Sequence, residues 1–150
     1  MHIKILLEPL EGEVEVVIRG RMDDPLVQKL LGACRQVEQA RRLFLYRDGR
    51  AFLCDYTEVD WFEARGGGVT AHMKGEELEA KCRLHELAEA AASRGFVQIS
   101  KGLLVNVSQI RSVSAAFSGN YLAELKDGKT TLVISRKYVK SFRSYVMEVL

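Results

Sequence analysis

The fold of this chain is decided by the stretch FVQISKGLLVN, residues 96–106. Apolar residues stand on both sides of the short polar triplet Ser100-Lys101-Gly102, which is typical of two strands joined by a tight turn. We therefore expect strands over 96–99 and 103–105. Further strands are expected downstream, where alternating segments are separated by turns at Gly119-Asn120 and Asp127-Gly128. These downstream segments are 110–117, 121–125 and 130–134.

Alternating patterns also occur upstream of this stretch. Residues 43–46 and 51–54 predict a hairpin around Asp48-Gly49. Residues 59–64 and 69–73 predict a second hairpin, with residues 65–68 as its turn. The chain before residue 96 is thus expected to add strands to the same β-rich unit.

Two helices are expected in this unit. Apolar residues share one face of the segment 82–93, and Gly95 is placed to end that helix. Tyr138, Phe142, Tyr145 and Val149 recur at helical spacing near the end of the chain, with Ser135 as the expected cap.

The first 42 residues read as a separate module. Residues 3–7 and 14–19 are expected to form two short strands, joined by a turn at residues 9–12. Asp23-Asp24-Pro25 is typical of a helix start, and the helix is expected to run to about Gln39. We therefore expect two domains, 1–42 and 43–150, the first serving dimerisation or sensing.

Composition indicates an ordinary globular protein. Hydrophobic residues make up 47% and charged residues 28% of the chain, and there are only 2 prolines. No segment approaches the roughly 20 apolar residues of a membrane helix, and no secretory signal is evident, so we expect a cytoplasmic protein that does not insert into membranes. The 3 cysteines form no CxxC pair, which favours reduced structural thiols over redox sensing.

The net charge of +2 hides an uneven distribution. Residues 96–150 carry eight lysines and arginines against three carboxylates, whereas residues 1–95 carry 14 against 17. A positive end of this kind suits a polyanion, but it is equally common on surfaces that bind nothing. Charge alone therefore leaves both interpretations open.

Motifs for catalysis or metal binding are incomplete. His85-Glu86-Leu87-Ala88-Glu89 resembles HExxH but lacks the second histidine that a zinc ion needs. Cys82 and His85 have no orienting third group at a recognisable spacing. Gly66 to Gly68 are not followed by Lys-Ser/Thr and open no helix, so they indicate a hairpin turn. We expect no enzyme activity, no metal and no cofactor.

The stretch 96–106 resembles the signature of the LytTR DNA-binding family. The resemblance extends to Ile110, Gly119-Asn120-Tyr121, Asp127-Gly128 and Ser135-Arg136-Lys137-Tyr138, and covers about residues 43 to 148. It implies an α+β, mainly β fold: an elongated arrangement of short antiparallel sheets with one intervening helix and a C-terminal helix. The small β-β-α module would precede it. It also implies that loops enter successive major grooves of a duplex.

By position in the family motif, several residues correspond to base- or phosphate-contacting sites. The implied DNA-binding residues are Arg65, Gly66, Gly67, Gly68, Val69, Ser100, Lys101 and Arg136. Lys137 and Lys140 are expected to touch phosphates or simply face water. Many family members carry histidine followed by arginine or asparagine where this chain has Ser100-Lys101, so their operator sequence is not transferred. Asn106 is expected to be a structural amide.

The favoured hypothesis is a sequence-specific transcription regulator, similar to response regulators, that binds double-stranded DNA as a homodimer or as paired protomers on repeated sites. The resemblance to compact stand-alone regulators also suggests a small membrane protein as a partner. Because 42 residues are too few for a receiver domain, we do not expect aspartyl phosphorylation as the input. The alternative is a protein-interaction or sensor module on a LytTR scaffold that has lost DNA binding.

Overall fold

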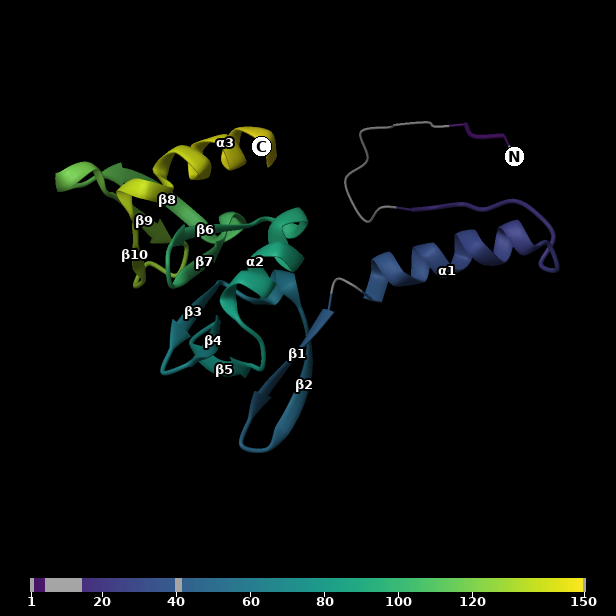
Figure 1. Ribbon diagram of the computed structural model, residues 1–150, viewed down its shortest axis with the longest axis horizontal. Coiled ribbons are helices and arrows are strands. Elements are labelled where there is room, and N and C mark those ends of the chain that lie inside the picture. The colour runs from purple at the N-terminus through teal and green to yellow at the C-terminus, as the bar shows by residue number, and fades with distance from the viewer. Residues whose placement is uncertain (1, 5–14, 40–41, 150) are drawn as a thin grey trace. The chain divides into compact units, whose positions relative to one another are not determined.

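The computed structural model describes residues 2–4, 15–39 and 42–149 (Figure 1). The chain divides into two units, Met1–Glu38 and Gln39–Leu150. Each unit is described by itself.

The first unit is built around α1 (Pro25–Gln39), as the sequence predicted. The Asp24 carboxylate accepts the main-chain N–H of Leu26 at 2.9 Å, and Pro25 occupies the first turn, where a missing N–H costs no hydrogen bond. The strand predicted over 14–19 is wrong for its described part, because residues 15–19 have no strand partner and no strand is assigned to them. The turn predicted at 9–12 and most of the strand predicted over 3–7 lie outside the described residues.

The second unit contains a seven-stranded antiparallel sheet of order β2-β1-β5-β4-β3-β7-β6. Its strands are β1 (Arg42–Arg47), β2 (Arg50–Asp55), β3 (Trp61–Arg65), β4 (Gly68–Met73), β5 (Glu76–Ala80), β6 (Phe96–Ser100) and β7 (Leu103–Asn106). Both Asp48 and Gly49 have positive φ, the conformation that a two-residue hairpin turn requires, and the hairpin predicted there is confirmed.

A second, three-stranded antiparallel sheet has the order β10-β9-β8. It consists of β8 (Ile110–Ala115), β9 (Tyr121–Leu125) and β10 (Thr131–Ile134). Two helices accompany the sheets, α2 (Leu84–Ala91) between β5 and β6, and α3 (Val139–Val149) at the end of the chain. Short 3-10 turns cover Tyr56–Glu58, Ala92–Arg94, Val107–Gln109, Phe117–Gly119 and Arg136–Tyr138.

Two hydrophobic clusters hold this unit together, because β6 and β7 bury side chains on both of their faces. Phe96 and Leu104 belong to a cluster with Phe62 and Leu87 of α2. The next residues along the strands, Val97 and Val105, belong to a second cluster. Helix α3 packs against this cluster through Phe142 (Figure 1). Successive side chains of a strand point to opposite faces, so these two strands join the layers. Nine buried or partly buried residues of the second cluster come from β6, β7, β9 and β10: Val97, Ile99, Leu103, Val105, Tyr121, Ala123, Leu125, Leu132 and Ile134.

The fold class expected from the sequence is confirmed, with local corrections. Strand β5 was not predicted, because Glu76-Glu77-Leu78-Glu79-Ala80 is rich in glutamate, which strands disfavour. Ser135 does not cap a helix with its side chain. Asn106 is a structural amide as predicted: it is buried, its Nδ2 donates to the Val59 carbonyl at 3.0 Å, and its Oδ1 accepts from the main-chain N–H of Ser108 at 3.1 Å.

Candidate nucleic-acid interface

Main-chain hydrogen bonds hold the three predicted DNA-contacting segments next to one another. The N–H of Ala64, at the end of β3, donates to the carbonyl of Gly102 in the β6–β7 turn at 2.9 Å. The N–H of Ser135 donates to the carbonyl of Ile99, near the end of β6, at 2.8 Å. The β6–β7 turn therefore lies between the β3–β4 turn and the segment that follows β10 (Figure 1).

An irregularity in β6 sets the direction in which this central turn leaves the sheet. Gln98 pairs with Leu104, but Ser100 pairs with the adjacent Leu103, so β6 contains one extra residue. A bulge of this kind bends the strand and re-aims the side chains after it. Lys101, the next residue, is exposed.

Lys101 shares a cleft of about 510 Å³ with the segment after β10. We call this the basic cleft; it is lined by Lys101, Ser118, Asn120, Ser135, Arg136, Lys137 and Tyr138. Lys137 also lines a neighbouring depression together with Lys140 of α3. Four of the predicted site residues, Lys101, Arg136, Lys137 and Lys140, thus form one connected cationic surface.

The loop between β8 and β9 positions Arg136. The Asn120 Oδ1 accepts the main-chain N–H of Arg136 at 2.9 Å. A Cβ added at Gly119 would lie 2.8 Å from the Arg136 Cδ, so the glycine leaves room for the arginine stem. Residues 118 and 120 line the cleft, yet the sequence indicated them only as a turn. The contact joins loops 16 residues apart, so no local pattern could have revealed it.

The cations of the basic cleft have no carboxylate partner among the side chains that the structure describes. None of the ion pairs formed by the side chains of residues 2–4, 15–37 and 42–146 includes Lys101, Arg136 or Lys137. Arg143 differs, because its guanidinium donates to the Tyr121 hydroxyl at 2.7 Å. Unpaired Arg and Lys side chains are the donors that phosphate and guanine edges accept.

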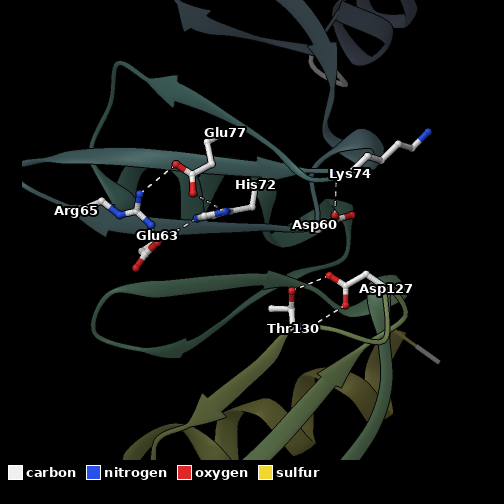
Figure 2. Close-up of polar contacts among 8 residues, drawn as sticks. All are labelled: Asp60, Glu63, Arg65, His72, Lys74, Glu77, Asp127 and Thr130. Atoms are coloured by element: carbon white, nitrogen blue, oxygen red, sulfur yellow. Dashed lines mark hydrogen bonds and ion pairs between the residues drawn. The ribbon is translucent and has the colours of Figure 1, made fainter.

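Arg65, at the β3–β4 turn, is in a different electrostatic setting (Figure 2). Its Nη2 lies 2.7 Å from the Glu63 Oε2, and its Nη1 lies 3.2 Å from the Glu77 Oε2. The negative charge of Glu63, above all, raises the pKa of the Arg65 guanidinium. Glu63 also contacts His72 Nε2 at 3.0 Å, and the His72 ring stacks on Trp61 with centroids 3.6 Å apart. Arg65 is therefore exposed but already paired.

The glycines of the β3–β4 turn are open to solvent, whereas Val69 is not. Gly66 and Gly67 have positive φ, as expected for this turn, and no atom lies within 4 Å of a Cβ added at either position. Val69 is only 3% exposed and its side chain packs in the core, so the predicted DNA contact of this residue would have to come from its main chain. The alternation Val69-Thr70-Ala71-His72 already carried this signal.

One cation beside this turn was not predicted from the sequence. Residues 64–69 line a cleft of about 480 Å³ with Cys82, Arg83 and Leu84. Arg83 is exposed there, immediately before α2. Burial raises the pKa of the Cys82 thiol in the same cleft, so at neutral pH this thiol is protonated and is a poor nucleophile.

Comparisons with known proteins agree with this arrangement. A solved LytTr DNA-binding domain from Bacillus cereus has the same fold, with a TM-score of 0.66, 17% sequence identity, and coverage of 71% of this chain and 96% of that domain. Sensory transduction protein LytT of Oceanobacillus iheyensis is 25% identical over 137 residues. That alignment covers 90% of this chain and 54% of the relative, so the chain spans about half the relative's length.

The family comparison covers the second unit from β2 onward and leaves out only β1 of its strands. The family model described as LytTr DNA-binding domain matches residues 49–147, which include all three predicted contact segments. A match over this length defines membership. The chain belongs to the LytTR family of DNA-binding domains.

Proposed function

We propose that this protein is a transcription regulator that recognises a specific duplex sequence through the turns at the edge of its larger sheet and through the segment after β10. The observation that carries the proposal is the basic cleft, where Lys101, Arg136 and Lys137 meet and none of them forms an ion pair among the described side chains. The family supports DNA as the partner. A regulator of this kind works in the cytoplasm, and none of the described helices is long and apolar enough to span a bilayer.

The residues differ in the contacts they suit. The planar guanidinium of Arg136 can donate two hydrogen bonds to O6 and N7 of one guanine in the major groove. Lys101 is a point charge that suits either a guanine or a phosphate, with Ser100 beside it in the same turn. Lys137 and Lys140 are placed for phosphates. The side-chain-free turn at Gly66 and Gly67 lets main-chain N–H groups approach the DNA backbone.

The salt dependence of duplex binding tests the proposal. If each protomer neutralises about four phosphates, a plot of the logarithm of the affinity against the logarithm of the salt concentration should have a slope of about −4. Fluorescence anisotropy with a labelled duplex measures this slope. Lys137→Ala should make it shallower by about 1, whereas Lys129→Ala, a control lysine in the turn at the other end of β9, should not. A flat response of the wild-type protein would rule out the proposal.

Selection from random duplexes tests sequence specificity separately. The selected sequences should contain a fixed guanine whose recognition is lost in Arg136→Ala. Their spacing reports whether one or two protomers bind, because paired protomers require repeated half-sites about one helical turn apart. Binding without any sequence enrichment would leave a DNA-binding protein but contradict specific readout.

A pair of exposed apolar residues in the β1–β2 hairpin supports a second role, the binding of a protein partner. Phe44 of β1 and Leu53 of β2 are directly opposite each other in the hairpin and are 57% and 55% exposed. We infer that this face contacts a second copy of the chain, giving a homodimer. Sedimentation of the wild-type protein should show a dimer. The double variant Phe44→Ser, Leu53→Ser should sediment as a monomer. A protein that dimerises but whose duplex binding does not respond to salt would favour the alternative function, a protein-interaction module that has lost DNA binding. A small membrane protein would then be a candidate partner.

A further inference from the structure

One apolar side chain beside the basic cleft has no role in the fold. Phe117, at the tip between β8 and β9, is 86% exposed, the highest value among the large hydrophobic residues that the structure describes. Neither hydrophobic cluster of the second unit includes it. Stability therefore does not explain an aromatic ring at this position.

The backbone holds this ring outward. Ser118 and Gly119 have φ of 62° and 78°, and a left-handed conformation is uncommon for serine. The Ala116 N–H donates to the Asn120 carbonyl at 2.9 Å and closes the loop below the tip. The turn thus presents Phe117 in a defined direction.

Phe117 belongs to the loop that positions Arg136, the residue most suited to reading a base. The next residue, Ser118, and Asn120 both line the basic cleft, and Asn120 accepts the main-chain N–H of Arg136. Gly119 lies against the Arg136 stem. A duplex that reaches the Arg136 guanidinium therefore lies next to the loop that carries Phe117.

We propose that Phe117 determines specificity by packing against the C5-methyl group of a thymine next to the base pair read by Arg136. The inference rests on the proposed major-groove readout. The thymine methyl is the apolar group that base pairs present in that groove, and phenylalanine is one of the side chains that contact it. Contact with the ring would remove both apolar groups from water.

Two other roles for an exposed aromatic fit this loop less well. A protein partner requires a continuous apolar patch, but the residues that follow Phe117 are Ser118, Gly119 and Asn120. Apolar wedges that kink DNA work mainly from the minor groove. The neighbouring Arg136 instead has the donor geometry for a guanine edge in the major groove.

The test combines a protein change with a DNA change. Each thymine of the selected duplex is replaced by deoxyuridine, which lacks only the methyl group. Wild-type affinity should fall about 4-fold at one position, the value for one buried methyl group. Phe117→Ala should bind the thymine duplex about 4-fold more weakly and lose the difference between the two duplexes. Phe117→Leu should keep part of that difference.

Controls separate this inference from the proposed function. Val113→Ala trims another exposed apolar side chain of the same sheet and should leave the thymine preference unchanged. If wild-type protein binds the duplex with the expected salt slope but discriminates at no thymine, or if Phe117→Ala keeps the discrimination, the inference is wrong and the proposed function stands. Equal losses on both duplexes with a smaller DNA bend would indicate a wedge and would also overturn it. Absence of any duplex binding would overturn both.

Discussion

Arg65 ends β3 and Arg136 follows β10, in segments that main-chain hydrogen bonds join to β6 and the β6–β7 turn, but of the two only Arg65 has carboxylates around it. Arg65 lies between Glu63 and Glu77, at 2.7 and 3.2 Å, whereas no ion pair of the described residues includes Arg136. A shared position therefore does not give the two guanidiniums the same free charge. A phosphate must compete with two glutamates for Arg65 but with water alone for Arg136.

The comparison predicts its largest effect for Arg136→Ala. Loss of a bidentate arginine–guanine contact should cost about 1 to 3 kcal/mol, or about 5- to 150-fold in affinity for the selected duplex. Fluorescence anisotropy measures it. Arg111→Ala, at the opposite end of β8, is the matched control and should change affinity less than twofold. Equal losses for Arg136→Ala on all sequences would indicate a phosphate contact instead.

A smaller loss is expected when Arg136 is displaced rather than removed. Gly119→Ala places a Cβ 2.8 Å from the Arg136 Cδ and should weaken duplex binding by about 3- to 10-fold, because the arginine stem must move. Gly128→Ala imposes a similar positive-φ strain, but nothing lies within 4 Å of its added Cβ. The two variants should therefore lose similar stability in urea unfolding, while only Gly119→Ala loses affinity. If Gly119→Ala and Gly128→Ala bound the duplex equally well, the position of the Arg136 stem would not depend on the loop at Gly119.

Removing the carboxylates around Arg65 should raise duplex affinity, whereas the changes at Arg136 lower it. Replacing Glu63 and Glu77 by glutamine should free Arg65, raise duplex affinity by about 2- to 5-fold, and steepen the salt slope by about 1. Arg65→Ala should cost little in the wild-type background and more in the double-glutamine background. A loss of affinity in the double-glutamine variant would show that the carboxylates position Arg65 for DNA rather than compete for it.

The sequence contained most of the secondary structure but only part of this contrast. The Asp48-Gly49 hairpin and the helix start at Pro25 were predictable, because turn geometry and helix caps depend on neighbouring residues. Ser135 was mistaken for a side-chain cap, whereas its main chain bonds to Ile99 on another strand. Such long-range partners leave no local signal.

The ion pairs of Arg65 were missed for a related reason. Glu77 belongs to β5, whose glutamate-rich sequence does not read as a strand, so its approach to Arg65 could not be foreseen. Pairing β5 with β4 places Glu77 opposite His72, on the face that Glu63 also occupies. The LytTR resemblance supplied the positions of Arg65 and Arg136, but only tertiary structure shows which charge is already engaged.

The smallest expected effect concerns Asp127, a carboxylate away from both arginines, and it is an effect of pH on stability. Asp127 accepts from the Thr130 hydroxyl at 2.6 Å (Figure 2). It also accepts from the main-chain N–H of Lys129 at 2.8 Å. The hydrogen bonds from Thr130, above all, lower the pKa of Asp127. Its contribution to stability is therefore present above the ordinary carboxyl pKa and is lost as pH falls through the lowered value.

Asp127→Asn should remove that contribution. Urea midpoints measured from neutral to acid pH should show a small deficit for the variant at neutral pH that shrinks as the wild-type carboxylate is protonated. The effect is small because Asp127 is exposed to water, which screens it. Duplex affinity at neutral pH should not change. A deficit that persists at acid pH would show that Asp127 stabilises the turn without its charge.

The main-chain bonds that join the three contact segments have an evolutionary consequence. Ala64 bonds to Gly102 and Ser135 bonds to Ile99 through groups that almost every amino acid possesses. Substitutions at the tips therefore exchange the chemical groups offered to DNA while the spacing between tips is retained. If these segments read DNA as proposed, single replacements at the tips would change the sequence recognised, whereas an insertion or deletion there would shift a whole segment.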